Sequence, residues 1–316
     1  MSALKTIDVV VPCFNEERSL PAFCERLRGA FEKLPDYSLR AIFVDDGSTD
    51  RTLDKLTELA SEFERVKMIS LSRNFGKEAA IMAGLSKADA DAVIVIDADL
   101  QHPPELISDL VAEWESGFDN VVARRSSRGS DGFLRRLGSK LFYWALNRMS
   151  SHEIVDGEGD YRLISKRVVK SLRELRESEL FLKGLYGFVG YSKTTVPYEV
   201  EAGTGRSSRY SFRQLAGLAM TGLLSNTTVP LRVSFWLGFV IALTSLMYLV
   251  TEVIRYFVVG TNAPGFTSLI AITTLIGGAN LLFVGIVGEY VGRMFMENKR
   301  RPQFIIGDET DHVREL

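Results

Sequence analysis

Two aspartates stand one residue apart in the stretch VIVIDADLQHPPE, residues 93–105, directly after an apolar run. Residues two apart in an extended chain point the same way, so the carboxylates of Asp97 and Asp99 can converge on one point. Two carboxylates this close raise each other's pKa unless a cation neutralises them. Oxygen ligands favour Mg²⁺ or Mn²⁺, and Gln101 can supply a further oxygen. We therefore predict a divalent cation held by Asp97, Asp99 and Gln101.

A helix start is the alternative explanation of this stretch, because an aspartate ahead of PPE suits an N-cap. A cap accounts for Asp99 or Gln101 but leaves Asp97 unexplained. Other polar clusters also follow apolar runs; they are Asn15-Glu16-Glu17, Asp45-Asp46-Gly47-Ser48 and Arg73-Asn74. Taken singly, each of these is also compatible with an ordinary turn or cap.

The elements that position these clusters alternate regularly through residues 1–125. Apolar runs predict strands at 7–14, 39–48, 66–72, 91–99 and 118–125, and amphipathic patterns between them predict helices at 17–34, 50–63, 77–88 and 103–116. This alternation indicates an α/β fold, a mainly parallel sheet with helices on both faces. Ligands of such sheets bind outside the carboxyl ends of the strands, which is where the polar clusters stand.

Composition narrows the class of protein. The chain has 316 residues and a formal net charge of −2, so it is neither disordered nor globally basic, and we expect no nucleic-acid partner. Its two cysteines, Cys13 and Cys24, are too few for a disulfide framework and lack the spacing of a zinc site. We expect free thiols in a reducing compartment.

The C-terminal third contains long uncharged runs. A bilayer core needs about 20 apolar helical residues, so we predict a transmembrane hairpin with spans at about Val233–Phe257 and Thr267–Gly288. Two buried helices of a soluble core are the alternative. The connecting loop has no Lys or Arg, whereas basic residues flank the outer ends; they are Arg232, Arg293, Lys299, Arg300 and Arg301. By the positive-inside rule, we expect both outer ends and the large N-terminal part to be cytoplasmic.

Two stretches before the hairpin, about 132–148 and 209–228, combine apolar stripes with basic residues and predict interfacial amphipathic helices. Helices packed on the sheet with a solvated basic face are the alternative. We therefore divide the chain into a cytoplasmic domain at 1–231, a hairpin at 232–290 and a cytoplasmic tail at 291–316. The end of the chain after Ile306 is expected to be loose.

The motifs together resemble one known family. DADLQHPPE, PCFNEE near the N-terminus and VDDGSTD after the second strand are similar to the inverting family-2 glycosyltransferases of GT-A (Rossmann-like) fold. SRNFGKEAAIMAGL, GDYRL and GEYVGR followed by RRP resemble the dolichol-phosphate-mannose synthase-like group, in particular bacterial polyprenyl-phosphate (bactoprenol) glycosyltransferases with two membrane spans. The resemblance covers nearly the whole chain.

The resemblance implies roles for individual residues. Nucleotide-sugar binding falls to Pro12, Asn15, Glu16, Asp45, Asp46, Arg73, Lys77 and Asp97. Asp97, Asp99 and Gln101 match the metal and diphosphate site. Asp160 in GDYRL, with Arg162 nearby, matches an acidic position facing the sugar; a structural ion pair between the two is the alternative.

The acceptor phosphate needs cations, for which arginine is well suited. The candidates are Arg124, Arg125, Arg128, Arg136, Lys140, Arg206, Ser208 and Arg209. Arg124 and Lys140 align best with the family, while attraction to anionic headgroups is the alternative role of these charges. The sequence departs from the family in GTGRSSRYSF, where Arg206 stands at a usual glycine and Gly203 at a usual arginine. Arg206 is a candidate to replace the missing cation.

The resemblance implies an enzyme of the inner or plasma membrane that transfers one sugar from a nucleotide sugar to polyprenyl phosphate. UDP-glucose is the first choice of donor; a UDP-aminoarabinose derivative and GDP-mannose stay open, as does a homo-oligomer. A polysaccharide synthase is disfavoured because the chain lacks a Q-x-x-R-W motif. A non-catalytic membrane scaffold or transport accessory is the alternative of another class, and the retention of both DxD carboxylates argues against it.

Overall fold

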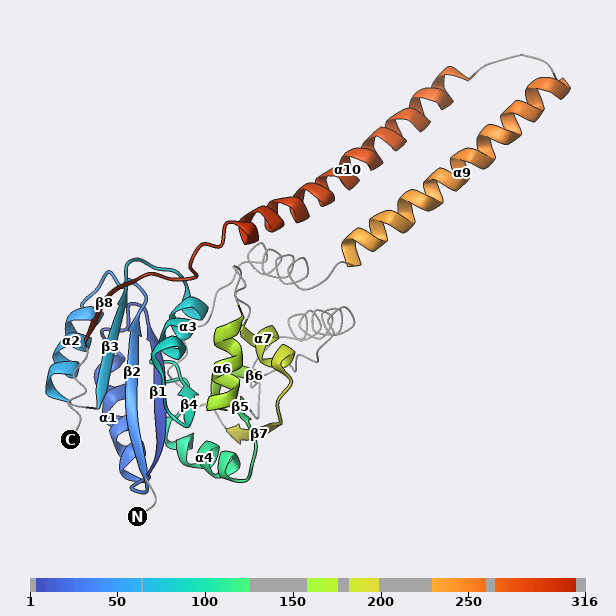
Figure 1. The fold of residues 1–316 in the computed structure, drawn as a ribbon. Helices are drawn as coiled ribbons and strands as arrows, with labels where there is room; N and C mark the ends of the chain where they lie inside the picture. The colour runs from blue at the N-terminus through green and yellow to red at the C-terminus, as the bar shows by residue number, and fades with distance from the viewer. Residues whose placement is uncertain are drawn as a thin grey trace. The chain divides into compact units, whose positions relative to one another are not determined.

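Apolar runs early in the chain form the parallel centre of a sheet (Figure 1). In a computed structural model of the chain, these strands are β1 (Lys5–Cys13), β2 (Tyr37–Asp45), β3 (Val66–Leu71) and β4 (Ala92–Val95). β1 pairs in parallel with both β2 and β4, and β2 pairs in parallel with β3. The carboxyl ends of four consecutive strands therefore meet at one edge, as the βα alternation predicts.

The sheet is completed by four strands from later in the chain. They are β5 (Asn120–Arg125), β6 (Glu158–Ser165), β7 (Lys193–Tyr198) and β8 (Ile306–Thr310). The strand order is β7-β5-β6-β4-β1-β2-β3-β8. β6 runs antiparallel to β4 and β5, β8 runs antiparallel to β3, and β5 pairs in parallel with β7. The sheet is thus mixed but mostly parallel.

Helices cover both faces of this sheet, as predicted. One face carries α1 (Leu20–Glu32), α2 (Thr52–Glu62) and α4 (Ile107–Glu115), which follows the 3₁₀ turn η1 (Pro104–Leu106). The other carries α3 (Lys77–Lys87), α6 (Lys166–Glu174) and α7 (Leu182–Val189). Alternation along β1 separates the two cores, because Val9 and Val11 belong to the first and Val10 to the second.

The C-terminal strand β8 corrects one expectation. Residues 306–310 are not loose but pair with β3 at the edge of the sheet. The Ile305 carbonyl accepts the backbone N–H of Ser72 at 2.9 Å, and Phe304 and Ile306 pack against the core on the α3 face. Apolar contacts therefore hold this strand although most of its own residues are polar.

Two long helices occupy the part of the chain where the hairpin is predicted, and they belong to a unit separate from the sheet. α9 spans Val229–Val259 and α10 spans Phe266–Asn298, about ten residues beyond the predicted end of the second span. An added Cβ at Gly238 would lie 3.4 Å from the ring of Phe283, so the helices approach closely there. By length and composition, Leu275–Asn298 is the one described segment able to cross a membrane, while Phe235–Tyr248 is a shorter apolar segment. The two-span hairpin stays a prediction.

The structure describes residues 4–63, 65–125, 158–175, 182–198, 229–259 and 265–310. The two predicted interfacial helices, 132–148 and 209–228, lie outside these residues. The described residues up to Tyr198 and residues 301–310 form one compact unit, and α9 and α10 belong to a second. The predicted functional division of the chain at 231 and 290 stays a prediction.

Candidate functional site

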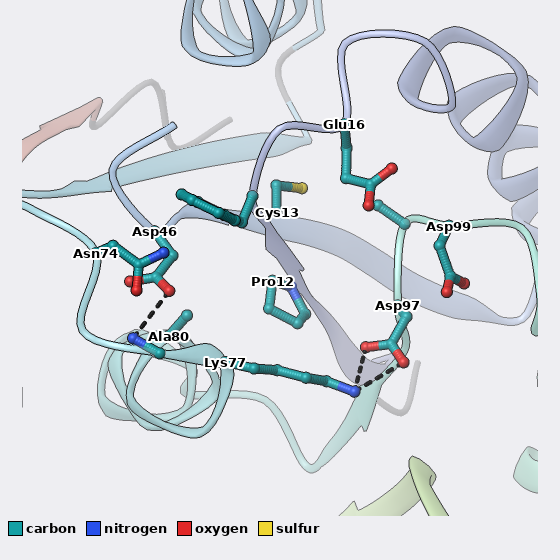
Figure 2. Close-up of a pocket in the computed structure, with 12 residues that line it drawn as sticks. Pro12, Cys13, Glu16, Asp46, Asn74, Lys77, Ala80, Asp97 and Asp99 are labelled. Atoms are coloured by element: carbon teal, nitrogen blue, oxygen red, sulfur yellow. Dashed lines mark hydrogen bonds and ion pairs between the residues drawn. The ribbon is translucent and has the colours of Figure 1, made fainter. Parts of the chain in front are cut away.

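A pocket of about 270 Å³ lies at the carboxyl ends of β1, β2 and β4 (Figure 2). Its lining residues are Pro12, Cys13, Phe14, Glu16, Asp46, Asn74, Gly76, Lys77, Ala80, Asp97, Ala98 and Asp99. Residues from four separate motifs, distant in sequence, are therefore brought to one cavity. Asn15, Asp45, Arg73 and Gln101, also predicted for the site, do not line it.

The loop after β1 is fixed by hydrogen bonds to the loop after β2. Asn15 adopts a φ of 56°, and its side-chain oxygen accepts the backbone N–H of Thr49 at 2.8 Å. The backbone N–H of Asn15 donates to the hydroxyl of Ser48 at 3.0 Å, and that of Glu16 donates to Thr52 at 2.8 Å. Asn15 thus shapes the turn that presents Glu16 to the pocket.

The two aspartates after β2 have different environments. Asp45 is buried, and both of its oxygens lie 3.3 Å from the backbone N–H of Ser48. Asp46 lines the pocket and accepts the backbone N–H groups of Phe75 at 2.7 Å and Gly76 at 3.0 Å. Burial and Asp45 raise the pKa of Asp46, and its two hydrogen bonds oppose that rise.

The glycine after Asp46 is required by a close approach of two loops. Gly47 has a φ of +67°, and a Cβ there would lie 2.5 Å from the backbone carbon of Arg73. The absence of a side chain at Gly47 therefore allows the loop after β3 to pack closely against the loop after β2. Arg73 itself is exposed, with its guanidinium 4.5 Å from the ring centroid of Phe75.

Lys77 is the positive group that compensates the strand-end carboxylates. Its ammonium lies 2.8 Å from the carboxylate of Asp97 and 2.7 Å from that of Asp160 (Figure 2 shows the contact with Asp97). Burial tends to lower the pKa of Lys77, but Asp97 and Asp160 outweigh it and raise that pKa. Burial tends to raise the pKa of Asp97, yet His102 and Lys77 lower it to about 2.

Asp99 stands on the same pocket wall as Asp97. One of its oxygens accepts the backbone N–H of Gln101 at 3.0 Å across Leu100, which has a φ of 62°. The structure therefore gathers two of the three predicted metal ligands in the pocket and uses the backbone of the third to orient Asp99. Among the described residues, no group of three or more His, Cys, Asp or Glu side chains is arranged to hold a metal ion.

These residues nevertheless fit a hard divalent cation. The pocket offers carboxylate oxygens from Asp97 and Asp99 with few competing soft ligands, and Mg²⁺ typically takes one or two carboxylates together with substrate phosphates. Ligands from a bound diphosphate would complete such a shell. The presence of the Asp97 and Asp99 carboxylates in one pocket is the observation that supports the fit.

Asp160 and Arg162 do not form the simple ion pair considered above, because Asp160 contacts Lys77. The Oδ1 of Asp160 and the Nε of Arg162 are buried and have no hydrogen-bond partner among the described residues. The guanidinium of Arg162 lies 3.7 Å from the ring centroid of Tyr186 and donates to the Gly159 carbonyl at 2.6 Å. One oxygen of Asp160 therefore has hydrogen-bonding capacity that no described residue uses.

The predicted acceptor cations divide between described and undescribed residues. Arg124 and Arg125 are exposed at the end of β5, where they pair in register with Pro197 and Tyr198 of β7. The remaining candidates lie outside the described residues; they are Arg128, Arg136, Lys140, Arg206, Ser208 and Arg209.

Two residues near the pocket carry features that the sequence did not reveal. His102 has its Nε2 3.4 Å from an oxygen of Asp97 and its Nδ1 2.7 Å from the hydroxyl of Tyr198. Burial and Asp160 raise the pKa of Glu78 to about 7, against a lowering hydrogen bond from Leu182. For His102, the sequence signal was its position inside the DADLQHPPE motif. For Glu78, the sequence offers no local signal of a functional role beyond its neighbour Lys77.

A mostly parallel sheet with a carboxylate-lined pocket at its strand ends defines an α/β class of fold, and residues 8–173 match the family described as Glycosyl transferase family 2. The chain belongs to this family and is a glycosyltransferase. Over 300 residues it is 38% identical to the putative glycosyltransferase CsbB of Bacillus subtilis strain 168, covering 95% of this chain and 91% of that protein.

A second relative is the bactoprenol glucosyl transferase of Shigella phage SfV, 39% identical over 303 residues, with 96% of this chain and 98% of that protein covered. Among solved structures, the mannosyltransferase PcManGT from Pyrobaculum calidifontis, in complex with GDP-Man and Mn²⁺, is similar with a TM-score of 0.50. It is 15% identical, and the match covers 93% of this chain and 86% of that one. This likeness supports the GT-A fold. The predicted family membership is confirmed.

Proposed function

We propose that this enzyme transfers one sugar, with inversion, from a nucleotide sugar to a polyprenyl phosphate at the membrane. The observation that carries the proposal is the proximity of a donor pocket to a basic strand end. Asp97 lies beside His102, His102 contacts Tyr198, and Tyr198 is the register partner of Arg125. The name of the Shigella phage relative, a bactoprenol glucosyl transferase, supports a polyprenyl acceptor.

The donor occupies the pocket through its nucleotide and diphosphate. Pro12, Glu16 and Asp46 face the nucleoside, with Asp46 the better candidate for the base and ribose; buried Asp45 holds the turn that presents it. UDP-glucose is the proposed donor, because the Shigella phage relative is named for glucosyl transfer. A UDP-aminoarabinose derivative and GDP-mannose are the competing donors.

The leaving diphosphate requires positive charge. A bound Mg²⁺ or Mn²⁺ at Asp97 and Asp99 would act as a Lewis acid for the departing phosphate oxygen. Lys77 adds a fixed cation at the same wall, because its ammonium lies 2.8 Å from Asp97. Lys77 also contacts one oxygen of Asp160 at 2.7 Å, and the other oxygen of Asp160 would orient a hydroxyl of the sugar.

The acceptor phosphate is itself the nucleophile. A phosphate monoester carries about −1.5 to −2 charge near neutral pH, so attack requires no strong general base. Arg124 and Arg125, together with the predicted cations that follow in the chain, would bind and aim this phosphate. Asp160 is therefore assigned first to orientation, and proton transfer is its second role.

The helices α9 and α10 supply the proposed membrane anchor. Large apolar side chains on both are exposed to an unusual degree, among them Phe257 at 80% and Leu281 at 76%. The basic residues that flank the outer ends of the two predicted spans favour a cytoplasmic catalytic domain in a multi-pass inner- or plasma-membrane protein. A homo-oligomer within the bilayer is compatible with this arrangement.

The test is incubation of the purified full-length protein with labelled nucleotide sugars, undecaprenyl phosphate and Mg²⁺ or Mn²⁺. Glucose from UDP-glucose should enter a lipid extract that releases glucose on mild acid treatment. Omission of the polyprenyl phosphate is the control. Transfer to water or to a non-lipid acceptor alone, from every donor in the panel, would reject the proposed acceptor.

A further inference from the structure

His102 lies between two polar groups that come from distant parts of the chain. Its Nε2 is 3.4 Å from the Oδ2 of Asp97, and its Nδ1 is 2.7 Å from the hydroxyl of Tyr198. The His102 side chain is only 17% exposed. The imidazole therefore has a defined partner on each nitrogen and little freedom to turn.

The chemistry of these partners fixes the direction of the hydrogen bonds. An ionised carboxylate only accepts, so the nitrogen facing Asp97 must carry the proton. When the opposite nitrogen carries no proton it accepts, and the Tyr198 hydroxyl donates to it. Burial raises the pKa of Tyr198 to about 12, which keeps that proton on the hydroxyl. The result is a one-way series from Tyr198 through His102 to Asp97.

Aromatic packing holds the imidazole plane in place. The ring centroids of Tyr161 and Tyr198 lie 5.4 Å and 5.7 Å from that of His102. A Cβ at Gly159 would come within 3.9 Å of the imidazole. Three segments meet at this ring: the DADLQ loop, the strand that carries Asp160, and the last residue of β7.

Lys77 cannot supply the same constraint. It is a flexible side chain, 43% exposed, and it divides its ammonium between Asp97 and Asp160. The imidazole reaches Asp97 from the same loop, and the rings of Tyr161 and Tyr198 pack against it. Ligand orientation of this kind is what outer partners of metal-binding carboxylates and histidines provide.

We infer that His102, oriented by Tyr198, is a positioning residue that fixes the Asp97 carboxylate for a divalent cation and its bound diphosphate. The inference rests on the proposed function. It also ties the donor site to the strand that leads into the predicted acceptor segment at 206–209, since Tyr198 is the last residue of β7. A substitution that displaces β7 should therefore also change the orientation of the Asp97 carboxylate.

The test measures Mn²⁺ and UDP binding to the full-length protein in detergent, without sugar donor or lipid. Free Mn²⁺ is followed by electron paramagnetic resonance, and UDP by calorimetry with and without Mn²⁺. His102→Phe retains a ring but removes both nitrogens, and His102→Gln retains an N–H that can reach Asp97. Tyr198→Phe removes only the hydroxyl.

Tyr191→Phe is the matched control. It removes a tyrosine hydroxyl from the segment just before β7, where that hydroxyl lies 2.9 Å from Ser171. We expect His102→Phe to weaken Mn²⁺ binding about 10- to 100-fold, the range for lost outer partners of metal ligands. Tyr198→Phe should produce a smaller loss, His102→Gln should recover most of it, and Tyr191→Phe should bind as the wild type does.

Equal Mn²⁺ affinity in wild type and His102→Phe would overturn the inference, as would a loss in His102→Gln as large as in His102→Phe. A wild-type protein that binds no Mn²⁺ would also overturn it. Because no donor or acceptor takes part, a failed lipid-transfer assay beside intact Mn²⁺ differences would reject the proposed function alone. Intact lipid transfer with unchanged Mn²⁺ binding in the variants would reject only the role of His102.

Discussion

The ammonium group of Lys77 lies 2.8 Å from the carboxylate of Asp97. The loop that carries Asp97 and Asp99 after β4 therefore has a lysine ammonium beside it before any metal or substrate binds. His102 and this contact together lower the pKa of Asp97 against the effect of burial, so its carboxylate is an acceptor for cationic or hydroxyl ligands.

Replacement of Lys77 tests this arrangement. Lys77→Met should lower sugar transfer roughly 100-fold, because removal of one aligned charge at a reacting phosphate costs about 10²–10³ in kcat. Initial rates with the donor that the panel identifies provide the measurement. Lys87→Met is the control on the same helix, since Lys87 pairs instead with Glu309 at 2.7 Å. Equal losses in the two variants would contradict a local role for Lys77.

The two carboxylates of the DxD motif give a second prediction. Asp97→Asn and Asp99→Asn should each abolish transfer while the far-ultraviolet circular dichroism and membrane extraction stay unchanged. The amides retain size but lose the charge that would hold a divalent cation. Asp109→Asn, an exposed change on α4, is the control. Unaltered turnover in either DxD variant would reject the metal assignment.

The acceptor cations give a third prediction. Arg124→Ala, at the exposed end of β5, should raise the KM for polyprenyl phosphate about tenfold, since each charge-assisted contact contributes about 1.5–3 kcal/mol. The same outcome is expected for Lys140→Ala, and Lys170→Ala, exposed on α6, is the control. If only the KM for the nucleotide sugar changed, Arg124 would belong to the donor site.

Glu78 gives a prediction for pH dependence. Its pKa rises from an ordinary 4.5 to about 7 because burial and Asp160 disfavour the charged form. Between these values the folded protein binds more protons than the unfolded chain, so stability falls as pH rises from 4.5 to 7. Glu78→Gln should flatten this part of a thermal-midpoint profile. Glu25→Gln, exposed on α1, should leave the slope as in the wild type.

Close packing of α3 on the sheet gives a fifth prediction. A Cβ at Gly84 would lie 2.3 Å from Val10 and 3.1 Å from Val44. Gly84→Ala should therefore destabilise the protein by about 1–3 kcal/mol through overpacking. Gly29→Ala on α1, where a Cβ meets nothing within 4 Å, should instead stabilise by roughly 0.5–1 kcal/mol. Denaturant titration gives the free energy of unfolding of both variants. Changes of the same sign and size in the two variants would contradict the prediction.

Sequence periodicity predicted the centre of the sheet because its signals are local. The runs that became β1 to β4 are apolar on both faces, and the polar clusters that follow them mark the strand ends. The pocket followed from that topology, since parallel strands place their carboxyl ends together. Asp46, Asp97 and Asp99 could thus be assigned before any coordinates.

Features that depend on distant pairing could not be predicted in this way. β8 has the sequence IGDET, whose mixed polarity carries no clear period, and it is held by contacts of neighbouring Phe304 and by β3. Likewise, nothing near Lys77 indicates that its partner would be Asp160, and nothing near His102 indicates Tyr198. Likewise, Gln101 does not line the pocket that Asp97 and Asp99 line, although all three belong to one loop.

The edge strand β8 has a consequence for how the enzyme is made. Ribosomes synthesise the chain from its N-terminus, so β1 to β7 and both long helices are complete before residues 306–310 emerge. Until then the outer side of β3 presents unpaired backbone groups, the kind of edge that invites association with other chains. The proposed membrane insertion of the helices would thus precede closure of this edge of the sheet.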